Sequence, residues 1–268
     1  MKQTIVFIHG MFQNPKSWAQ WMAYFTERGY NCIAPAWPDH TGEPRQLRAN
    51  PPATLGELSL DEVIAAMQSA VISAGGNNED LSQRPIVIGH SVGGLITQLL
   101  AAKNLIRLGV PISTVAPNMM MTLDWPFFKN VTAIANPLKG NEPFMQTPEG
   151  FHESFCNTLN DAAALQAFNE TATHDSRNVL RGCLGPSGHL DLDMPHVPLL
   201  FISGREDQII PTELVEKNSK AYTDETSKTA WQEFQHRSHF ICEEPGWEDV
   251  AAIVHTWIEQ QTVQLPTL

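Results

Sequence analysis

Short apolar runs alternate along the chain with segments in which apolar residues recur every three or four positions. A continuous apolar run is typical of a strand covered on both faces, and the wider spacing is typical of a helix with one buried face. Their alternation predicts an α/β fold with a mostly parallel sheet of about six strands flanked by helices. The predicted strands are TIVFIHG (4–10), YNCIAPAW (30–37), PIVIGHS (85–91), PISTVAPN (111–118), PLLFISG (198–204) and TAWQEFQ (229–235).

Four segments carry the helical pattern, and two of them also contain signals for a helix start. Asn14 and Pro15 supply a cap and a proline at the first helical position, and Ser59 with Glu62 forms a capping box. The apolar stripes of these helices predict core packing and no chemistry. They are Trp18, Trp21, Met22 and Phe25; Leu60, Val63, Ile64, Met67 and Val71; Val92, Leu95, Ile96, Leu99 and Leu100; and Val250, Ile253, Val254, Trp257 and Ile258.

The segment from about Asn118 to Pro195 interrupts this alternation. It separates two predicted strands by far more residues than a simple crossover needs, and parts of it have helical character. We therefore expect residues 118–195 to form a helical cap over the carboxyl edge of the sheet, with residues 1–117 and 196–268 as the core.

The stretch VIGHSVGGL places Ser91 where a predicted strand meets a predicted helix. In parallel α/β sheets, ligands bind beyond the carboxyl ends of the strands. A nucleophile at such a turn needs glycine neighbours, because a Cβ would collide with nearby backbone, and Gly89, Gly93 and Gly94 meet that need. The stretch predicts that Ser91 is a nucleophile; the alternative is a small residue in a tight turn.

Four motifs together resemble the α/β-hydrolase superfamily, of the esterase and lipase type. GHSVGG resembles the nucleophile elbow of that family, and FIHGM resembles its His-Gly oxyanion loop. SGREDQIIP resembles the loop that carries the acid, and RSHF resembles the loop that carries the histidine. The motifs follow the family order of serine, acid and histidine. The two antiparallel strands that lead the larger family members have no counterpart here, so we expect a compact version of the fold.

The resemblance implies a role for each motif residue. Ser91 would be the nucleophile, His239 the base that takes its proton, and Asp207 the acid that orients His239. The backbone N–H groups of Met11 and Val92 would bind the oxyanion of the tetrahedral intermediate.

Three neighbours compete with these assignments. Glu206 lies beside Asp207, and Asp124 follows the preceding strand at a position that resembles an alternative acid site in some family members. The Asp-x-x-x-Pro pattern of residues 207–211 favours Asp207. His236 lies close to His239, but the position of His239 before a phenylalanine matches the family better.

Other histidines are expected to serve structure. We expect His9 to tether the His-Gly loop and His90 to flank the nucleophile. The stretch GHLDLDMPH has the residue types of a metal site, but we interpret it as a solvated connection and predict no metal and no cofactor. Its candidate ligands would be His189, Asp191, Asp193 and His196.

Methionine and aromatic residues are dense where the cap should begin. Such side chains form a packed cap interface or an adaptable apolar wall of a substrate pocket. We predict substrate contact for Met119, Met120, Trp125 and Phe128.

Composition narrows the partners and the location. With 29 acidic and 17 basic side chains the formal net charge is -12, which disfavours nucleic acid. The four cysteines form no C-x-x-C pair, so neither a disulfide framework nor a zinc site is indicated. We see no signal peptide and no apolar run of about 18 residues, so we expect a cytoplasmic protein without a membrane partner. A homodimer is possible.

The combined interpretation is a serine hydrolase that cleaves a carboxylic ester, lactone or thioester of small to medium apolar character through an acyl-serine intermediate. Three alternatives stay open on the same residues. They are a cofactor-free perhydrolase or haloperoxidase-type activity, a lyase that uses the triad as a base, and a ligand-binding receptor with little turnover.

Overall fold

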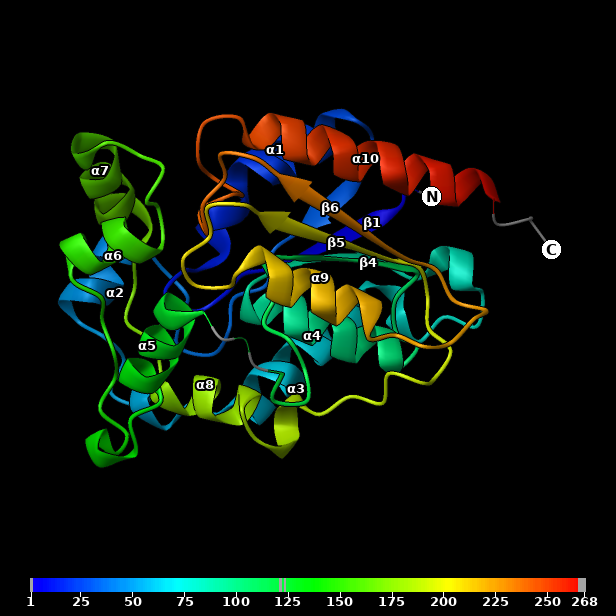
Figure 1. Ribbon diagram of the computed structural model, residues 1–268. Helices are drawn as coiled ribbons and strands as arrows, with labels where there is room; N and C mark the ends of the chain where they lie inside the picture. The colour runs from blue at the N-terminus through cyan, green and yellow to red at the C-terminus, as the bar shows by residue number, and fades with distance from the viewer. Residues whose placement is uncertain (1, 121, 123, 265–268) are drawn as a thin grey trace.

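The computed structural model describes residues 2–120, 122 and 124–264. Its centre is a six-stranded parallel sheet with the strand order β2-β1-β3-β4-β5-β6 (Figure 1). The predicted α/β fold with a mostly parallel sheet of about six strands is confirmed. The strands are β1 Thr4–Ile8, β2 Asn31–Ile33, β3 Ile86–His90, β4 Leu108–Ile112, β5 Leu199–Gly204 and β6 Thr229–Phe234.

Helices cover both faces of the sheet, as the continuous apolar strands require. In Figure 1, α1 and α10 lie above the sheet, and α3, α4 and α9 lie below it. Each face of the sheet has its own hydrophobic core, and alternate residues of β1 belong to different cores. Ile5 and Phe7 pack toward α1 and α10, whereas Val6 and Ile8 pack toward α3 and α4. These helices are α1 Ala19–Glu27, α3 Leu60–Val71, α4 Val92–Ala102, α9 Thr212–Lys220 and α10 Trp247–Gln264.

The predicted helix starts and stripes agree with the structure, with one correction. Ser59 and Glu62 form the capping box at the start of α3. Ile253 was predicted to be core but is 44% exposed. The buried stripe of α10 runs through Val250, Val254 and Ile258, and this spacing of four leaves Ile253 on the solvent side.

Two strands differ from their predicted ranges by three or more residues at one end. The fourth strand was predicted at residues 111–118 but is β4, Leu108–Ile112, so Gly109 and Pro111 belong to a buried strand. It ends at Ile112, and the next residue, Ser113, turns the chain with a φ of 42°. The strand predicted at 30–37 is the shorter β2, and Trp37 lies beyond it, stacked on His9 at 4.6 Å between ring centroids.

The chain between β4 and β5, residues 113–198, is called the β4–β5 segment here. In Figure 1, its helices α5, α6 and α7 lie beyond the carboxyl ends of the strands, whereas α8 lies below, near α3. Helical character was predicted for this part of the chain; its division from the core as a separate cap domain stays a prediction. The helices are α5 Trp125–Ile134, α6 Pro148–Ser154, α7 Asp161–Thr171 and α8 Arg177–Cys183.

An arginine side chain outside the β4–β5 segment attaches this segment to the rest of the molecule. Arg48, on α2 (Pro44–Ala49), donates to the carbonyl oxygens of Phe168 and Ala172 at 3.1 and 2.7 Å, at the end of α7. A third bond, to the Asn169 carbonyl at 2.7 Å, completes the attachment of Arg48 to the last turn of α7. Short helical turns complete the fold: η1 Pro15–Trp18, η2 Leu55–Glu57, η3 Ile72–Gly76, η4 Leu81–Gln83, η5 Pro137–Lys139 and η6 Pro186–Gly188.

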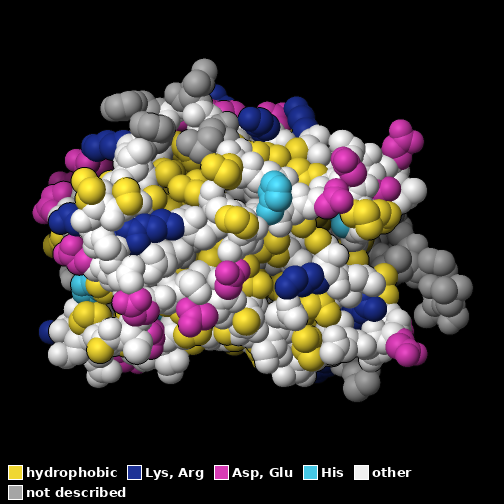
Figure 2. Space-filling view, turned by 90° about the horizontal axis from the view of Figure 1, so that it is seen from below, with side chains coloured by type: hydrophobic (Ala, Val, Ile, Leu, Met, Phe, Trp, Pro, Cys, Tyr) yellow, Lys and Arg dark blue, Asp and Glu magenta, His cyan; other side chains and the backbone are white. Residues whose placement is uncertain are grey.

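Charged side chains on the face in Figure 2 are mixed, with Lys and Arg scattered among Asp and Glu. In the described part of the chain, no helix combines the length and the apolar character that crossing a bilayer requires.

Candidate active site

Ser91 lies on a sharp turn between β3 and α4. Its φ and ψ are 56° and -117°, which is a strained conformation for a residue with a side chain. The turn depends on glycines: a Cβ on Gly89 would lie 2.1 Å from the Gly93 carbonyl oxygen, and a Cβ on Gly93 would lie 2.2 Å from the Ile8 oxygen. The backbone of the elbow can therefore form only without side chains at these two positions, and it holds Ser91 at the carboxyl edge of the sheet.

His239 and Asp207 form a buried pair at the same edge. The His239 Nδ1 and the Asp207 Oδ2 are 2.7 Å apart, and the two residues are 1% and 5% exposed. The backbone N–H groups of Ile209 and Ile210 both donate to Asp207 Oδ1 at 2.8 Å, which fixes the carboxylate. Asp207 follows β5 and His239 follows β6, so the strand order brings together residues that are distant in sequence.

A second carboxylate anchors the loop that carries His239. Glu244 is buried, and its two oxygens accept hydrogen bonds from the N–H and the hydroxyl of Ser238, each at 2.9 Å. The Thr158 hydroxyl also bonds to Glu244, which links this loop to the β4–β5 segment. Glu244 was not predicted from the sequence, because its partners become apparent only when the chain is folded.

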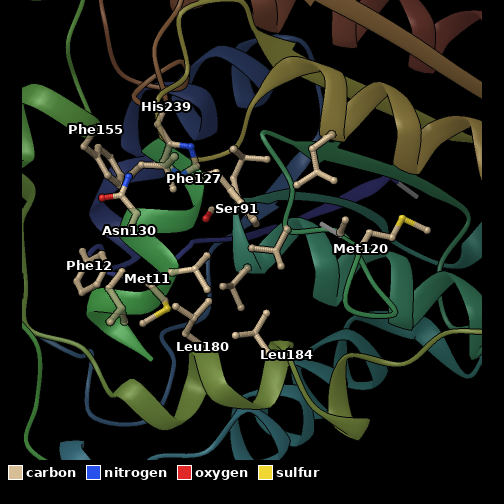
Figure 3. Close-up of a pocket in the computed structure, with 18 of the residues that line it drawn as sticks. Met11, Phe12, Ser91, Met120, Phe127, Asn130, Phe155, Leu180, Leu184 and His239 are labelled. Carbon is tan, nitrogen blue, oxygen red and sulfur yellow. The ribbon is translucent and has the colours of Figure 1, made fainter. Parts of the chain in front are cut away.

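Ser91 and His239 line one cavity of about 760 Å³, mouth included (Figure 3). The side chains around them are mostly apolar and come from the strand ends, from α5 and α8, and from the loops between them. Two carboxamides, Asn130 and Gln146, add polar groups to the wall. Other lining residues include Met11, Phe12, Val115, Phe127, Phe155, Leu180, Leu184, Ile209 and Leu214.

Met11 and Val92, whose N–H groups are predicted to bind the oxyanion, both line this cavity. Val92 is the first residue of α4, so its N–H has no acceptor within the helix. Met11 lies in the loop after β1, residues 9–13, which is called the His-Gly loop below. Its side of the loop faces the cavity, because Met11 is one of the lining residues. A Cβ on Gly10 would lie 2.7 Å from the Ser91 Cβ, so this loop passes close to the serine only because residue 10 is glycine.

His9 is a neutral structural residue of the His-Gly loop. The Trp37 N–H donates to its Nε2 at 3.3 Å, so its Nδ1 carries the proton and donates to the Gly10 carbonyl at 2.9 Å. Burial and the nearby His40 lower the pKa of His9 to about 3. The arrangement agrees with the tethering role predicted for His9.

His90 holds the loop of the candidate base. Its Nε2 and the His239 carbonyl oxygen are 2.8 Å apart, which makes Nε2 the donor. Burial and the neighbouring His239 ring, 4.6 Å away between centroids, hold the pKa of His90 well below its usual value. A neutral His90 therefore flanks Ser91 in sequence and supports His239 in space.

The competing residues have other surroundings or contacts in the structure. Asp124 caps α5, with its Oδ1 accepting the Phe127 N–H at 2.9 Å. His236 is exposed at a turn with a φ of 59°. The backbone N–H of Glu206 donates to the Arg237 carbonyl at 2.9 Å. Of the candidate acids, Asp207 is the one bonded to His239 in the structure.

The predicted substrate contacts have mixed outcomes. Met119 and Met120 line the cavity. Trp125 and Phe128 lie on α5, but their side chains are outside the described part of the chain, so their predicted contact with substrate is left open. Phe127, between them, is buried and lines the cavity. The lining residues Asn130 and Gln146 were not predicted, because no sequence signal marks a single carboxamide as part of a cavity wall.

The stretch with metal-ligand residue types makes ordinary polar contacts. His196 Nδ1 and the Val197 carbonyl oxygen are 2.7 Å apart, and the Asp193 carboxylate bonds to the Thr223 hydroxyl. Within residues 2–120, 122 and 124–264, no group of three or more His, Cys, Asp or Glu could hold a metal ion.

A serine on a strand-to-helix elbow, beside a buried histidine–aspartate pair on the same sheet edge, is the arrangement of a nucleophilic hydrolase site. The chain matches the model of the alpha/beta hydrolase family over residues 5–253, and it belongs to that family. Its sequence matches no curated protein.

Solved structures with this fold have low sequence identity to the chain. A monoacylglycerol lipase from Paleococcus ferrophilus is 18% identical, with a TM-score of 0.69, over 95% of this chain and 93% of the lipase. Tomato methylketone synthase I is 14% identical, with a TM-score of 0.69, over 97% and 99%. A methylesterase from Arabidopsis is 12% identical, with a TM-score of 0.66, over 96% and 99%. At these identities the likeness concerns the fold.

Proposed function

We propose that this alpha/beta hydrolase cleaves carboxylic esters, or related lactones or thioesters, through an acyl-Ser91 intermediate. The observation that carries the proposal is one apolar cavity lined by both Ser91 and His239, with Asp207 bonded to the far side of the His239 ring. The fold neighbours named as a lipase and a methylesterase agree with this chemistry. The neighbour named as a synthase shows why the fold alone does not define the reaction.

The proposed reaction has two halves. His239 takes the proton of Ser91 as its Oγ attacks the ester carbonyl, while Asp207 accepts the Nδ1–H and keeps the other ring nitrogen free to act as a base. The N–H groups of Met11 and Val92 stabilise the oxyanion. The alcohol leaves with the proton from His239, and a water activated by His239 then hydrolyses the acyl group.

The cavity wall supports an apolar substrate of small to medium size. Leu180, Leu184 and Leu214 contribute apolar surface, and Phe155 lies against the His239 ring at 4.9 Å between centroids. Met119 and Met120 can adapt to an irregular acyl or alcohol group.

The proposed partner is a small molecule, and the net charge of -12 argues against nucleic acid. The cytoplasmic location and the homodimer stay predictions.

Labelling with a fluorophosphonate, followed by intact-protein mass spectrometry, tests the nucleophile. We expect one adduct on the wild type, no adduct on Ser91→Ala, and an undiminished adduct on Ser82→Ala, a matched change at an exposed serine. A series of p-nitrophenyl esters of increasing acyl length then measures turnover and the size of the pocket.

The alternatives give other results in the same experiments. A perhydrolase forms the adduct and transfers the acyl group to peroxide in preference to water. A lyase or a receptor gives no acyl transfer, and the receptor binds a small molecule tightly with negligible turnover. A folded wild type that gives no adduct and no ester turnover would contradict the proposal.

A further inference from the structure

The His-Gly loop is bonded to a short stretch of the β4–β5 segment, residues 173–175. Phe12 has a φ of 65°, which is unusual for a residue with a side chain. Both of its backbone polar groups bond to this stretch: the Phe12 N–H donates to Asp175 Oδ2 at 2.9 Å, and the Phe12 carbonyl accepts the Thr173 N–H, also at 2.9 Å. The conformation of the residue after Met11 is therefore held from outside the loop.

Asp175 is completely buried, and its own backbone is fixed. Its N–H and carbonyl form an antiparallel bridge with Phe144, with bonds of 2.9 and 2.8 Å. Its carboxylate Oδ1 accepts the Ser176 N–H at 2.7 Å, so each oxygen has a backbone donor. A buried carboxylate needs such partners, because burial of an unpaired charge is costly.

His40 lies beside the Asp175 carboxylate. Its Nδ1 lies 2.8 Å from the Pro38 carbonyl oxygen and must carry a proton, while its Nε2 faces Asp175 Oδ2 at 3.4 Å. Burial is the largest single effect and lowers the pKa of His40, but the Asp175 carboxylate, the Pro38 carbonyl and Asp39 together raise it above its usual value. The other titratable groups facing His40 are Asp39, which also raises its pKa, and His9, at 5.5 Å between ring centroids and neutral.

We propose that Asp175 is a positioning residue for the oxyanion hole: its carboxylate, balanced by His40, holds the Phe12 N–H and thereby sets the direction of the Met11 N–H toward Ser91. The inference rests on the proposed ester hydrolysis. Asp175 lies 163 residues from Phe12 in sequence and acts through the His-Gly loop rather than on the substrate. Since an oxyanion donor acts mainly on the transition state, loss of this support lowers kcat and leaves KM nearly unchanged.

Asp175→Asn tests this role with almost no change of shape. A carboxamide offers one acceptor and one donor, so its NH₂ must face either the Phe12 N–H or the Ser176 N–H. We expect kcat on a p-nitrophenyl ester to fall about 100-fold, with KM within about twofold, as for loss of one oxyanion donor. Affinity for a trifluoromethyl ketone, which forms a tetrahedral adduct on the serine, falls by a similar factor.

Arg48→Gln is the matched control. It removes the hydrogen bonds to the end of α7, just before residue 173, and leaves both Phe12 bonds in place. We expect a lower melting temperature with kcat close to that of the wild type. If Arg48→Gln loses as much kcat as Asp175→Asn, or if Asp175→Asn keeps kcat within twofold, the inference is wrong.

His40→Gln decides the question if Asp175→Asn does not fold. It removes the charge beside Asp175 and leaves both backbone donors, and we expect a three- to tenfold lower kcat at neutral pH. An unchanged kcat would overturn the inference. A wild type that gives neither ester turnover nor a fluorophosphonate adduct would instead overturn the proposed function, and the inference with it.

Discussion

Asp207–His239 and Asp175–His40 are two buried aspartate–histidine pairs with the same side chains and different surroundings. Asp207 accepts both of its backbone N–H groups on Oδ1 and leaves Oδ2 to His239 at 2.7 Å. Asp175 accepts one N–H on each oxygen, and its histidine lies 3.4 Å away. Asp207 therefore keeps one carboxylate oxygen for its histidine alone. In Asp175, the oxygen that faces the histidine also accepts a backbone N–H.

The second nitrogen of each histidine separates the two pairs further. His40 Nδ1 donates to the Pro38 carbonyl, so both of its ring nitrogens are committed to the protein. The His239 ring reaches the cavity that contains Ser91 (Figure 3). A buried aspartate–histidine pair is therefore a candidate for acid–base chemistry only where the remaining ring nitrogen can reach a reactant. Elsewhere such a pair holds backbone groups in place.

The largest effect is expected from removal of the Ser91 hydroxyl, which the Asp207–His239 pair is proposed to activate. Ser91→Ala should lower kcat on the order of 10⁶-fold, because no other group can form the acyl intermediate. The melting temperature should stay nearly unchanged, since alanine at a φ of 56° costs about what serine does. Ester turnover and thermal unfolding measure both quantities, and a large loss of stability would return Ser91 to a structural role.

Asp207→Asn should be the next most damaging change. Its amide no longer selects the His239 tautomer with a proton on Nδ1, and a kcat loss of about 10⁴-fold is expected for this defect. Steady-state kinetics of Asp207→Asn and Asp175→Asn on one ester compare the two pairs directly. If the Asp175 variant proves slower, the roles given to the two pairs are reversed.

His40→Gln should reveal the charge of the second pair through folding stability. The folded pKa of His40 is raised above 6.5. The pair therefore stabilises the fold fully below about pH 6.5, and this contribution is lost as the pH rises through the folded pKa. Urea unfolding at pH 6 and pH 9 should give a larger difference between wild type and variant at pH 6. An equal difference at both pH values would mean that His40 is neutral.

The smallest effect is expected for Asp124→Asn, outside both pairs. Asp124 accepts the Phe127 N–H as the cap of α5, and asparagine caps a helix about as well. Activity should stay within about twofold and the melting temperature within about a degree. If this variant proves slower than Asp207→Asn in the same ester assay, Asp124 is the acid.

Local signals predicted much of the fold. The capping box at Ser59 and the elbow around Ser91 depend on residues within a few positions of each other, so their pattern can be interpreted without a structure. The start of β4 was predicted three residues too late because Gly109 is a usual turn residue, and burial between two strands overrode that preference.

The residues that hold the site in place could not be predicted in the same way. Glu244 anchors the His239 loop, and Asp175 holds Phe12 across 163 residues. A single acidic residue in a helical or loop segment gives no sign of the backbone N–H that it will meet. The sequence therefore indicated the residues that are expected to react, but not the residues that hold the loops of the site in place.

The close backbone contacts around Ser91 restrict how the protein can change. Gly10, Gly89 and Gly93 have no room for even a methyl group, so mutation there is expected to destroy the fold of the elbow rather than alter its selectivity. The cavity wall from Met119 to Leu184 consists of side chains that can be exchanged for others of similar size. New substrate preferences should therefore evolve, or be selected in the laboratory, almost entirely through this wall.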